Sequence, residues 1–268
     1  NNLLMNMFIT LNDVIFSQPF PAIVTILIVL GMVRLGQLLT DKYPSNHLDN
    51  SMLGYIVIII LVSIFFNFIA TVGFLNIYVG RGVGIVLGGC GLYFLFECFQ
   101  KTKNIEWEKL NNNKLELIGL IIVALLAVSM FLLSITPPTD ADSLDYHLGV
   151  PLDWVRNGGA YPRPDWNHSR VIGLGEAINV FGLLNGTDNL GQLVQYSGLW
   201  IVCFTLINSI PSKKIKILIF LFVFTVPLNL FFSVSQKPQL FQAALIFFFL
   251  INVYRIKPRN NRIDFLYL

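Results

Sequence analysis

Charged residues are scarce in this chain of 268 residues. Asp, Glu, Lys and Arg make up 12% of it, against about 25% in an ordinary soluble domain. The net charge of +3 is small, and no basic stripe with interleaved aromatics is visible, so nucleic-acid binding is not expected. Hydrophobic residues account for 55% of the chain and form long runs, which indicates an integral membrane protein.

Cysteine is also rare. The three cysteines, Cys90, Cys98 and Cys203, lie in or beside apolar runs without CxxC spacing, and we interpret them as packing residues that leave the redox compartment open. The start has no charged region followed by a cleavable apolar segment. Because the sequence begins Asn-Asn and stops within the apolar Phe265–Leu268, we expect a fragment of a longer protein.

Long apolar runs are what the chain has instead. A membrane-spanning helix needs about 20 apolar residues, and an all-α polytopic membrane protein with about seven transmembrane helices is expected. The candidate spans are Phe20–Leu39, Leu53–Ile77, Tyr78–Phe96, Leu117–Ile135, Leu190–Ile210, Ile215–Val234 and Leu240–Tyr254. The preceding Leu3–Phe16 carries Asp13 and is expected either at the interface or as the end of an earlier helix. Gly84 and Gly88, four residues apart, indicate helix packing.

The basic residues predict an orientation. Lysines and arginines gather in the loops 97–116 and 211–214 and after residue 254. Two predicted spans separate each loop from the next, so all three lie on one side, which the positive-inside rule makes cytoplasmic. The chain then divides into N-terminal helices (1–135), an extracytoplasmic segment (136–189) and further transmembrane helices (190–268).

The extracytoplasmic segment 136–189 holds seven of the fifteen acids. A connection longer than about 15 residues is usually functional or disordered, and its tryptophans and tyrosines argue against disorder. Two amphipathic juxtamembrane helices are expected. One runs from Leu144 to Arg156, capped by Ser143 and ended by Gly158-Gly159, with Leu144, Leu148, Leu152 and Val155 on a face for the membrane surface. The other covers Val171–Leu184 and ends at Asn185-Gly186.

Asp140 and Asp142 are the candidate catalytic residues. They follow directly after the fourth span, where a partly desolvated carboxylate is a stronger base. The alternative is structural, because Asp140 could cap a helix and acids favour helix N-termini.

Seven further residues are candidates for substrate binding. Cations on the outer side could hold an anionic group, or could simply contact lipid headgroups. His147 and His168, with the aspartates, could hold a divalent metal, but no metal-binding spacing supports this, and no cofactor is expected. The substrate-binding candidates are Tyr146, His147, Arg156, Arg163, His168, Glu176 and Lys237.

The stretch PPTDADSLDYHLGVPLDWVRNG, residues 137–158, resembles a pattern of the GT-C glycosyltransferase superfamily. That superfamily includes bacterial protein O-mannosyltransferase-like and aminoarabinose-transferase-like enzymes. Its pattern is a span, a short proline-bearing exit, Asp-[Ser/Ala]-Leu-x-Tyr-His-Leu and an amphipathic helix ending in Gly. The likeness covers about residues 136–185. The sequence departs from the family in two respects. In a second family feature, a Lys-x-Asp-like outer turn that corresponds to Lys237, Gln239 replaces the acid. The large outer loop follows the first span in the family, whereas about four spans precede it here.

The resemblance implies a GT-C-like fold in a bacterial inner membrane and a role in the cell envelope. It implies a polyprenyl-phosphate sugar donor, with Asp142 as general base, Asp140 beside it, and Lys237 or a loop arginine stabilising the leaving lipid phosphate. Two alternatives stay open: a transporter or flippase of lipid-linked or anionic solutes, and a non-catalytic membrane assembly protein. A transporter is expected to carry charges or broken helices at mid-membrane, and Pro227 and Asn229 inside the sixth span are the hint of this kind.

Overall fold

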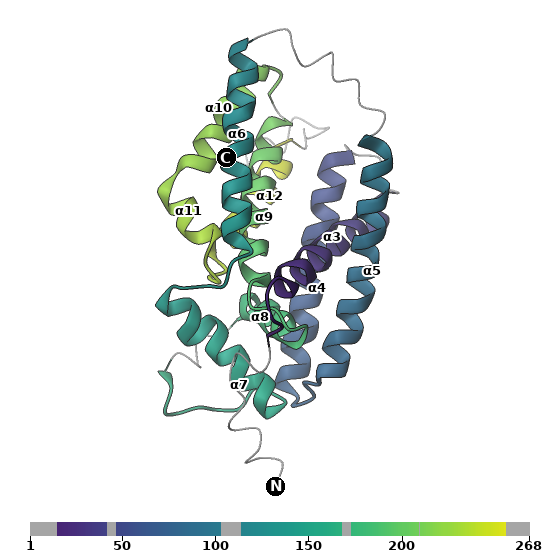
Figure 1. Ribbon diagram of the computed structural model, residues 1–268, viewed down its shortest axis with the longest axis vertical. Coiled ribbons are helices and arrows are strands. Elements are labelled where there is room, and N and C mark those ends of the chain that lie inside the picture. The colour runs from purple at the N-terminus through teal and green to yellow at the C-terminus, as the bar shows by residue number, and fades with distance from the viewer. Residues whose placement is uncertain (1–14, 42–46, 103–113, 168–172, 209, 256–268) are drawn as a thin grey trace, which may run out of the picture.

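The computed structural model describes residues 15–41, 47–102, 114–167, 173–208 and 210–255 (Figure 1). All regular elements in these ranges are helical. They are α3 (Phe20–Thr40), α4 (His47–Thr71), α5 (Ile77–Thr102), α6 (Lys114–Ser134), the π-helix η2 (Ser143–Leu148), α7 (Gly149–Asn157), α8 (Leu174–Leu184), α9 (Leu190–Ile207), α10 (Lys213–Thr225), α11 (Pro227–Ser233) and α12 (Gln239–Arg255). The segment Leu3–Phe16, expected at the interface, lies almost wholly outside the described residues.

Five helices are long and apolar enough to cross a membrane: α3, α4, α5, α6 and α9. The bent pair α10 and α11 is a sixth crossing if it is counted as one span. The last predicted span, Leu240–Tyr254, corresponds to α12, whose 17 residues leave it shorter than the others. The expectation of an all-helical fold is therefore confirmed for the described ranges, where five or six helices are able to cross a membrane and seven spans were predicted.

Proline explains the break in the sixth predicted span. Pro227 disfavours the helical conformation of the residue before it, and Val226 is extended, with φ −64° and ψ 120°. The two helices meet at 66°. The Asn229 side-chain amide donates to the carbonyl of Val223 at 2.9 Å, which satisfies a backbone group left free by the break.

The helices form two groups that meet at α9. Helix α3 packs against α4 and α5, whereas α10 packs against α6 and α9, and α11 and α12 pack against α9. The two groups lie on opposite sides of the view in Figure 1, with α7 at one end of the molecule. Since α9 also contacts α3, α4 and α8, it joins both groups to the segment between α6 and α9.

Glycines let α3, α4 and α5 approach closely. A Cβ on Gly36 of α3 would lie 2.3 Å from the carbonyl carbon of Gly54 in α4. The predicted pair in α5 is half right. A Cβ on Gly84 would lie 1.7 Å from Asn185 Oδ1, so this glycine allows a close contact. A Cβ on Gly88 would have no neighbouring atom within 4 Å.

The two ends of the bundle differ in chemistry. At one end, Asp49 at the start of α4 accepts a hydrogen bond from Asn208 at 2.8 Å and pairs with Arg255 at 3.5 Å. At the other end, the Asn189 side chain donates to the carbonyl of Ile135 at 2.6 Å, which ties the start of α9 to the end of α6. The segment 136–189 therefore lies at the end opposite to Arg255, as the predicted chain path requires.

The close approach of α3 and α4 predicts a cost for any side chain at Gly36. We expect Gly36→Ala to lower the free energy of unfolding by about 1–3 kcal/mol, because the added methyl overlaps the Gly54 backbone. Gly88→Ala is the matched control, since its methyl enters open space and alanine favours a helix. Thermal unfolding in detergent measures both, and equal stability of the two variants would rule out this contact.

Candidate functional site

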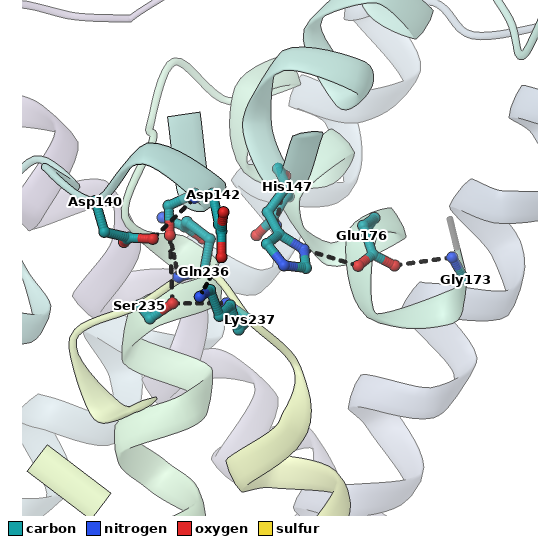
Figure 2. Close-up of polar contacts among 10 residues, drawn as sticks. Asp140, Asp142, His147, Gly173, Glu176, Ser235, Gln236 and Lys237 are labelled. Carbon is teal, nitrogen blue, oxygen red and sulfur yellow. Dashed lines mark hydrogen bonds and ion pairs between the residues drawn. The ribbon is translucent and has the colours of Figure 1, made fainter. Parts of the chain in front are cut away.

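The segment after α6 is joined to the turn between α11 and α12 by a buried hydroxyl. Ser143 Oγ lies 3.3 Å from Ser235 Oγ and accepts a hydrogen bond from the Gln236 backbone N–H at 3.0 Å. The Ser235 hydroxyl in turn accepts from the Lys237 backbone N–H at 3.2 Å. Figure 2 shows these contacts beside the two aspartates. Residues more than 90 positions apart in the sequence therefore form one local structure.

Asp142 and Lys237 meet at this junction. Lys237 Nζ lies 2.7 Å from Asp142 Oδ2, and the aspartate is 56% exposed whereas the lysine is 11% exposed. The hydrogen bond to Asp142 raises the pKa of Lys237. The ammonium also lies 4.9 Å from the centre of the Phe231 ring. A charged pair is thus accessible from outside, with its lysine held on an aromatic face.

Asp140 has a structural role in this arrangement. Its Oδ1 accepts a hydrogen bond from the Ser143 backbone N–H at 2.9 Å, which is what a capping side chain does at the start of a helix. The prediction that Ser143 caps the helix was wrong, because the Ser143 hydroxyl points to Ser235 instead. Asp140 therefore supports the position of its neighbour Asp142.

A π-helix carries the next two candidates. The predicted helix from Leu144 is divided into η2 and α7, and π-helical turns often occur at functional sites. Glycine ends α7 as predicted, since Gly158 takes the left-handed conformation with φ 72°. Within η2, the rings of Tyr146 and His147 lie 4.0 Å apart. Burial, followed by the charge of Asp142, raises the pKa of Tyr146, so the phenol belongs to the same electrostatic environment as the pair.

His147 and Glu176 form a second, buried pair. His147 Nδ1 lies 2.9 Å from Glu176 Oε1, and their side chains are 3% and 6% exposed. The other carboxylate oxygen of Glu176 accepts from the Gly173 N–H at 2.8 Å, so the glutamate is held on both sides. His147 Nε2 has no hydrogen-bond partner in the described part of the chain. In the view of Figure 2 the imidazole lies between Asp142 and Glu176.

Two predicted arginines lie apart from this junction. Arg163 contacts Asp153 at 2.7 Å and Asp165 at 2.9 Å, and its guanidinium lies 5.8 Å from the centre of the Trp166 ring. The hydrogen bond to Arg163 lowers the pKa of Asp165. Arg156, in the last turn of α7, has a buried Nε without a partner in the described ranges. His168 lies outside the described residues. Arg163 therefore organises the loop itself.

The two helices of the segment are more buried than expected. Leu148 and Leu152 of the face predicted for the membrane surface pack against Leu183 instead, although Leu144 is exposed. Helix α8, predicted to be amphipathic, is buried at every residue from Glu176 to Leu184, after an exposed Leu174. It packs against α4, α7 and α9. The apolar face of α8 therefore packs against other helices of the protein and not against the membrane surface, and α8 is part of the core under the site.

An apolar cavity of about 280 Å³ lies beside the junction, between α4, α8, α9 and α12. Pro238, the residue after Lys237, forms part of its wall. Its other walls include Ile59 and Ile60 of α4, Ile178 of α8 and Phe241 of α12. An apolar occupant of this cavity would lie next to the residue that carries the lysine.

Several residues of the junction were not predicted. They are neutral and buried, and only Ser143 had been given a role, as a helix cap: Ser143, Asn179, Gln192, Ser235 and Gln236. The turn Ser235–Pro238 was expected on the same face as segment 136–189, but Lys237 was its only site candidate. Among the described residues, no group of three or more His, Cys, Asp and Glu side chains is arranged to hold a metal ion.

These features define a class of protein: a polytopic helical membrane protein with an acid–lysine site at one end of its bundle. A sequence model of the DUF1420 N-terminal domain matches residues 92–265, more than half of the chain, and the protein belongs to that family. The matched range contains the whole junction, whereas α3 and α4 precede it. No curated protein and no solved structure matched the chain.

The buried junction predicts a stability cost when its hydroxyl is removed. We expect Ser143→Ala to lower the free energy of unfolding by about 1–3 kcal/mol, because the Gln236 N–H loses its acceptor in a buried place. Thr139→Ala, at an exposed position of the same segment, should change it little. Denaturant or thermal unfolding in detergent checks the difference, and an unchanged Ser143→Ala variant would argue against the junction.

Proposed function

We propose that the protein is a membrane glycosyltransferase that moves a sugar from a polyprenyl-phosphate donor to an acceptor on the extracytoplasmic face of a bacterial inner membrane. The observation that carries the proposal is the contact of Asp142 with Lys237, at 2.7 Å, beside an apolar cavity. Both residues carry the roles of base and cation that the GT-C resemblance implies. They come from separate parts of the chain and meet at one end of the bundle.

The chemistry assigns one role to each residue. Asp142 takes the proton of the acceptor hydroxyl while its oxygen attacks the anomeric carbon of the sugar, and the bond from that carbon to the phosphate oxygen breaks with inversion. Lys237 stabilises the negative charge that gathers on the departing lipid phosphate. Without donor, the two side chains neutralise each other. A bound phosphate competes for the ammonium and leaves the carboxylate free to act as the base.

The surroundings supply the remaining parts. The cavity walls are mainly aliphatic and aromatic side chains of α4, α8 and α12, which suits an isoprenoid chain next to the Lys237 phosphate site. The Tyr146 phenol lies within the electrostatic reach of Asp142 and Lys237, so we assign it to contact with the sugar or the acceptor. Glu176 holds His147 in place, so this pair positions the acceptor side of the site.

A transporter of lipid-linked or anionic solutes is the second candidate. The 66° bend between α10 and α11 favours it, because transporters place broken helices at their substrate sites. The ion pair of Arg34 with Glu97, at 3.1 Å, joins α3 to α5 on the side away from the bend. The polar groups thus gather at the end of the bundle, which fits surface chemistry better than passage through it.

Sugar transfer provides the direct test. Membranes that contain the protein are incubated with a panel of polyprenyl-phosphate sugars, and release of the sugar from each lipid is followed. We expect Asp142→Asn to reduce transfer by about 10²-fold or more, the usual contribution of a general base, while expression and membrane insertion persist. Lys237→Gln should reduce it similarly.

Asp145→Asn is the control for that experiment, because Asp145 is an exposed acid on the π-helix that directly follows Asp142. It should retain transfer. Full transfer by Asp142→Asn would refute its assignment as the base. Uptake or flipping of the lipid-linked sugar without transfer would instead identify the transporter.

Orientation is tested by cysteine labelling in a variant without Cys90, Cys98 and Cys203. An impermeant maleimide should label Asn167→Cys, in the loop after α7, in intact cells. Lys214→Cys, in the first turn of α10 at the other end of the bundle, should react once the membrane is permeabilised. The opposite pattern would place the acid–lysine site in the cytoplasm.

A further inference from the structure

The apolar cavity beside the junction extends along α12, away from Lys237. Its wall on that side consists of Pro238, Phe241, Gln242 and Leu245. These positions follow the spacing of one helix face. At a rise of about 1.5 Å per residue, Leu245 lies roughly 10 Å further from the junction than Pro238. The cavity therefore leads from the lysine into the helical part of the protein.

The lining of the cavity is mainly hydrocarbon. The other wall residues are Ile59, Ile60 and Ser63 of α4, Leu174, Gly175 and Ile178 of α8, and Gly191, Val194 and Gln195 of α9. The Gln195 side-chain oxygen already accepts a hydrogen bond from the Phe241 backbone N–H at 2.9 Å. Cavities with apolar walls stay dry and take up apolar molecules. The occupant that fits this lining is a hydrocarbon chain.

The cavity reaches the surface between the start of α8 and α12. Two of its wall residues at this point are exposed, Leu174 at 48% and Gln242. One turn further along the same face of α12, Ile246 is 62% exposed. An exposed apolar face on an apolar helix suits contact with lipid. A hydrocarbon chain can therefore enter the cavity from the bilayer.

The volume of the cavity limits the size of its occupant. An apolar cavity of about 150 Å³ binds one benzene ring, which has six carbons. By that measure, a cavity of about 280 Å³ holds roughly ten or eleven carbons, the size of two isoprene units. The length agrees, because the four chain bonds of an extended isoprene unit, each about 1.5 Å long, cover about 5 Å. The paired acyl chains of a phospholipid are too large for this space.

We propose that the cavity binds the two isoprene units next to the phosphate of the donor lipid, with that phosphate at Lys237. Lys237 directly precedes Pro238 of the cavity wall, so a cation stands beside an apolar space that holds one short chain. A single-chain isoprenyl phosphate matches both features. This assignment rests on the proposed function, since that function supplies the donor, and it names the part of the lipid that the protein recognises. Further isoprene units remain in the bilayer.

Protection of a cysteine at the far end of the cavity tests the assignment. Leu245→Cys is made in a variant without the native cysteines, and its reaction with N-ethylmaleimide is followed in membranes. Geranyl phosphate, which has two isoprene units, should slow the reaction about tenfold at a concentration of about ten times its Kd. Farnesyl phosphate, with three units, should act like geranyl phosphate. Isopentenyl phosphate, with one unit, and inorganic phosphate should leave the rate unchanged, because neither reaches Leu245.

Two variants control this experiment. Ile246→Cys, the next residue of α12 but on its exposed face, should react at the same rate with and without each compound. Lys237→Gln, combined with Leu245→Cys, should raise the concentration of geranyl phosphate needed for protection about tenfold or more, because the phosphate loses a charged donor. If Leu245→Cys does not fold, Ser63→Cys on the α4 wall takes its place, and geranyl phosphate should protect it in the same way.

Unchanged labelling of the cavity cysteine at saturating geranyl phosphate would overturn the proposal. Equal protection by isopentenyl phosphate, or protection that needs farnesyl phosphate, would refute the length of two units. Protection that is unaffected by Lys237→Gln would refute the phosphate position. Sugar transfer without protection would refute the cavity as the lipid site and leave the transferase standing, whereas protection without transfer from any donor would do the reverse.

Discussion

The buried hydroxyl of Ser143 is the contact on which the site depends. It accepts the Gln236 backbone N–H at 3.0 Å and lies 3.3 Å from Ser235 Oγ, so it joins the segment after α6 to the turn before α12. A buried backbone N–H needs an acceptor, and no other one for Gln236 is seen in the described ranges. Without this junction, Asp142 and Lys237 would have no reason to meet.

The charges of the outer segment are divided between support and chemistry. Arg163 joins Asp153 and Asp165, and Asp140 holds the start of the π-helix. Each of these interactions fixes backbone that would otherwise be a long loop. Stability alone does not explain the pair of Asp142 and Lys237, because its carboxylate is 56% exposed to screening water although its lysine is 11% exposed. An exposed acid paired with a largely buried lysine at an organised junction is better explained by binding than by folding.

Sequence patterns predicted the parts of the fold that depend on local composition. Hydropathy located the long apolar helices, and Gly158 marked the end of α7. Loop charges predicted that segment 136–189 and the Lys237 turn share one end of the bundle. Long-range contacts between neutral residues could not be predicted, because Ser143 and Gln236 carry no periodic or charge signal. The burial of α8 was missed for the same reason, since its partners α4 and α9 come from distant parts of the chain.

Crosslinking tests the junction most directly. Ser143→Cys and Ser235→Cys are combined in a variant without native cysteines, with a protease site inserted near Pro211, in the connection between α9 and α10. Hydroxyl oxygens 3.3 Å apart suit a disulfide between these positions. Mild oxidation should keep the two halves together after cleavage, and reduction should release them. Complete separation of the halves under oxidising conditions would contradict the junction and the site built on it.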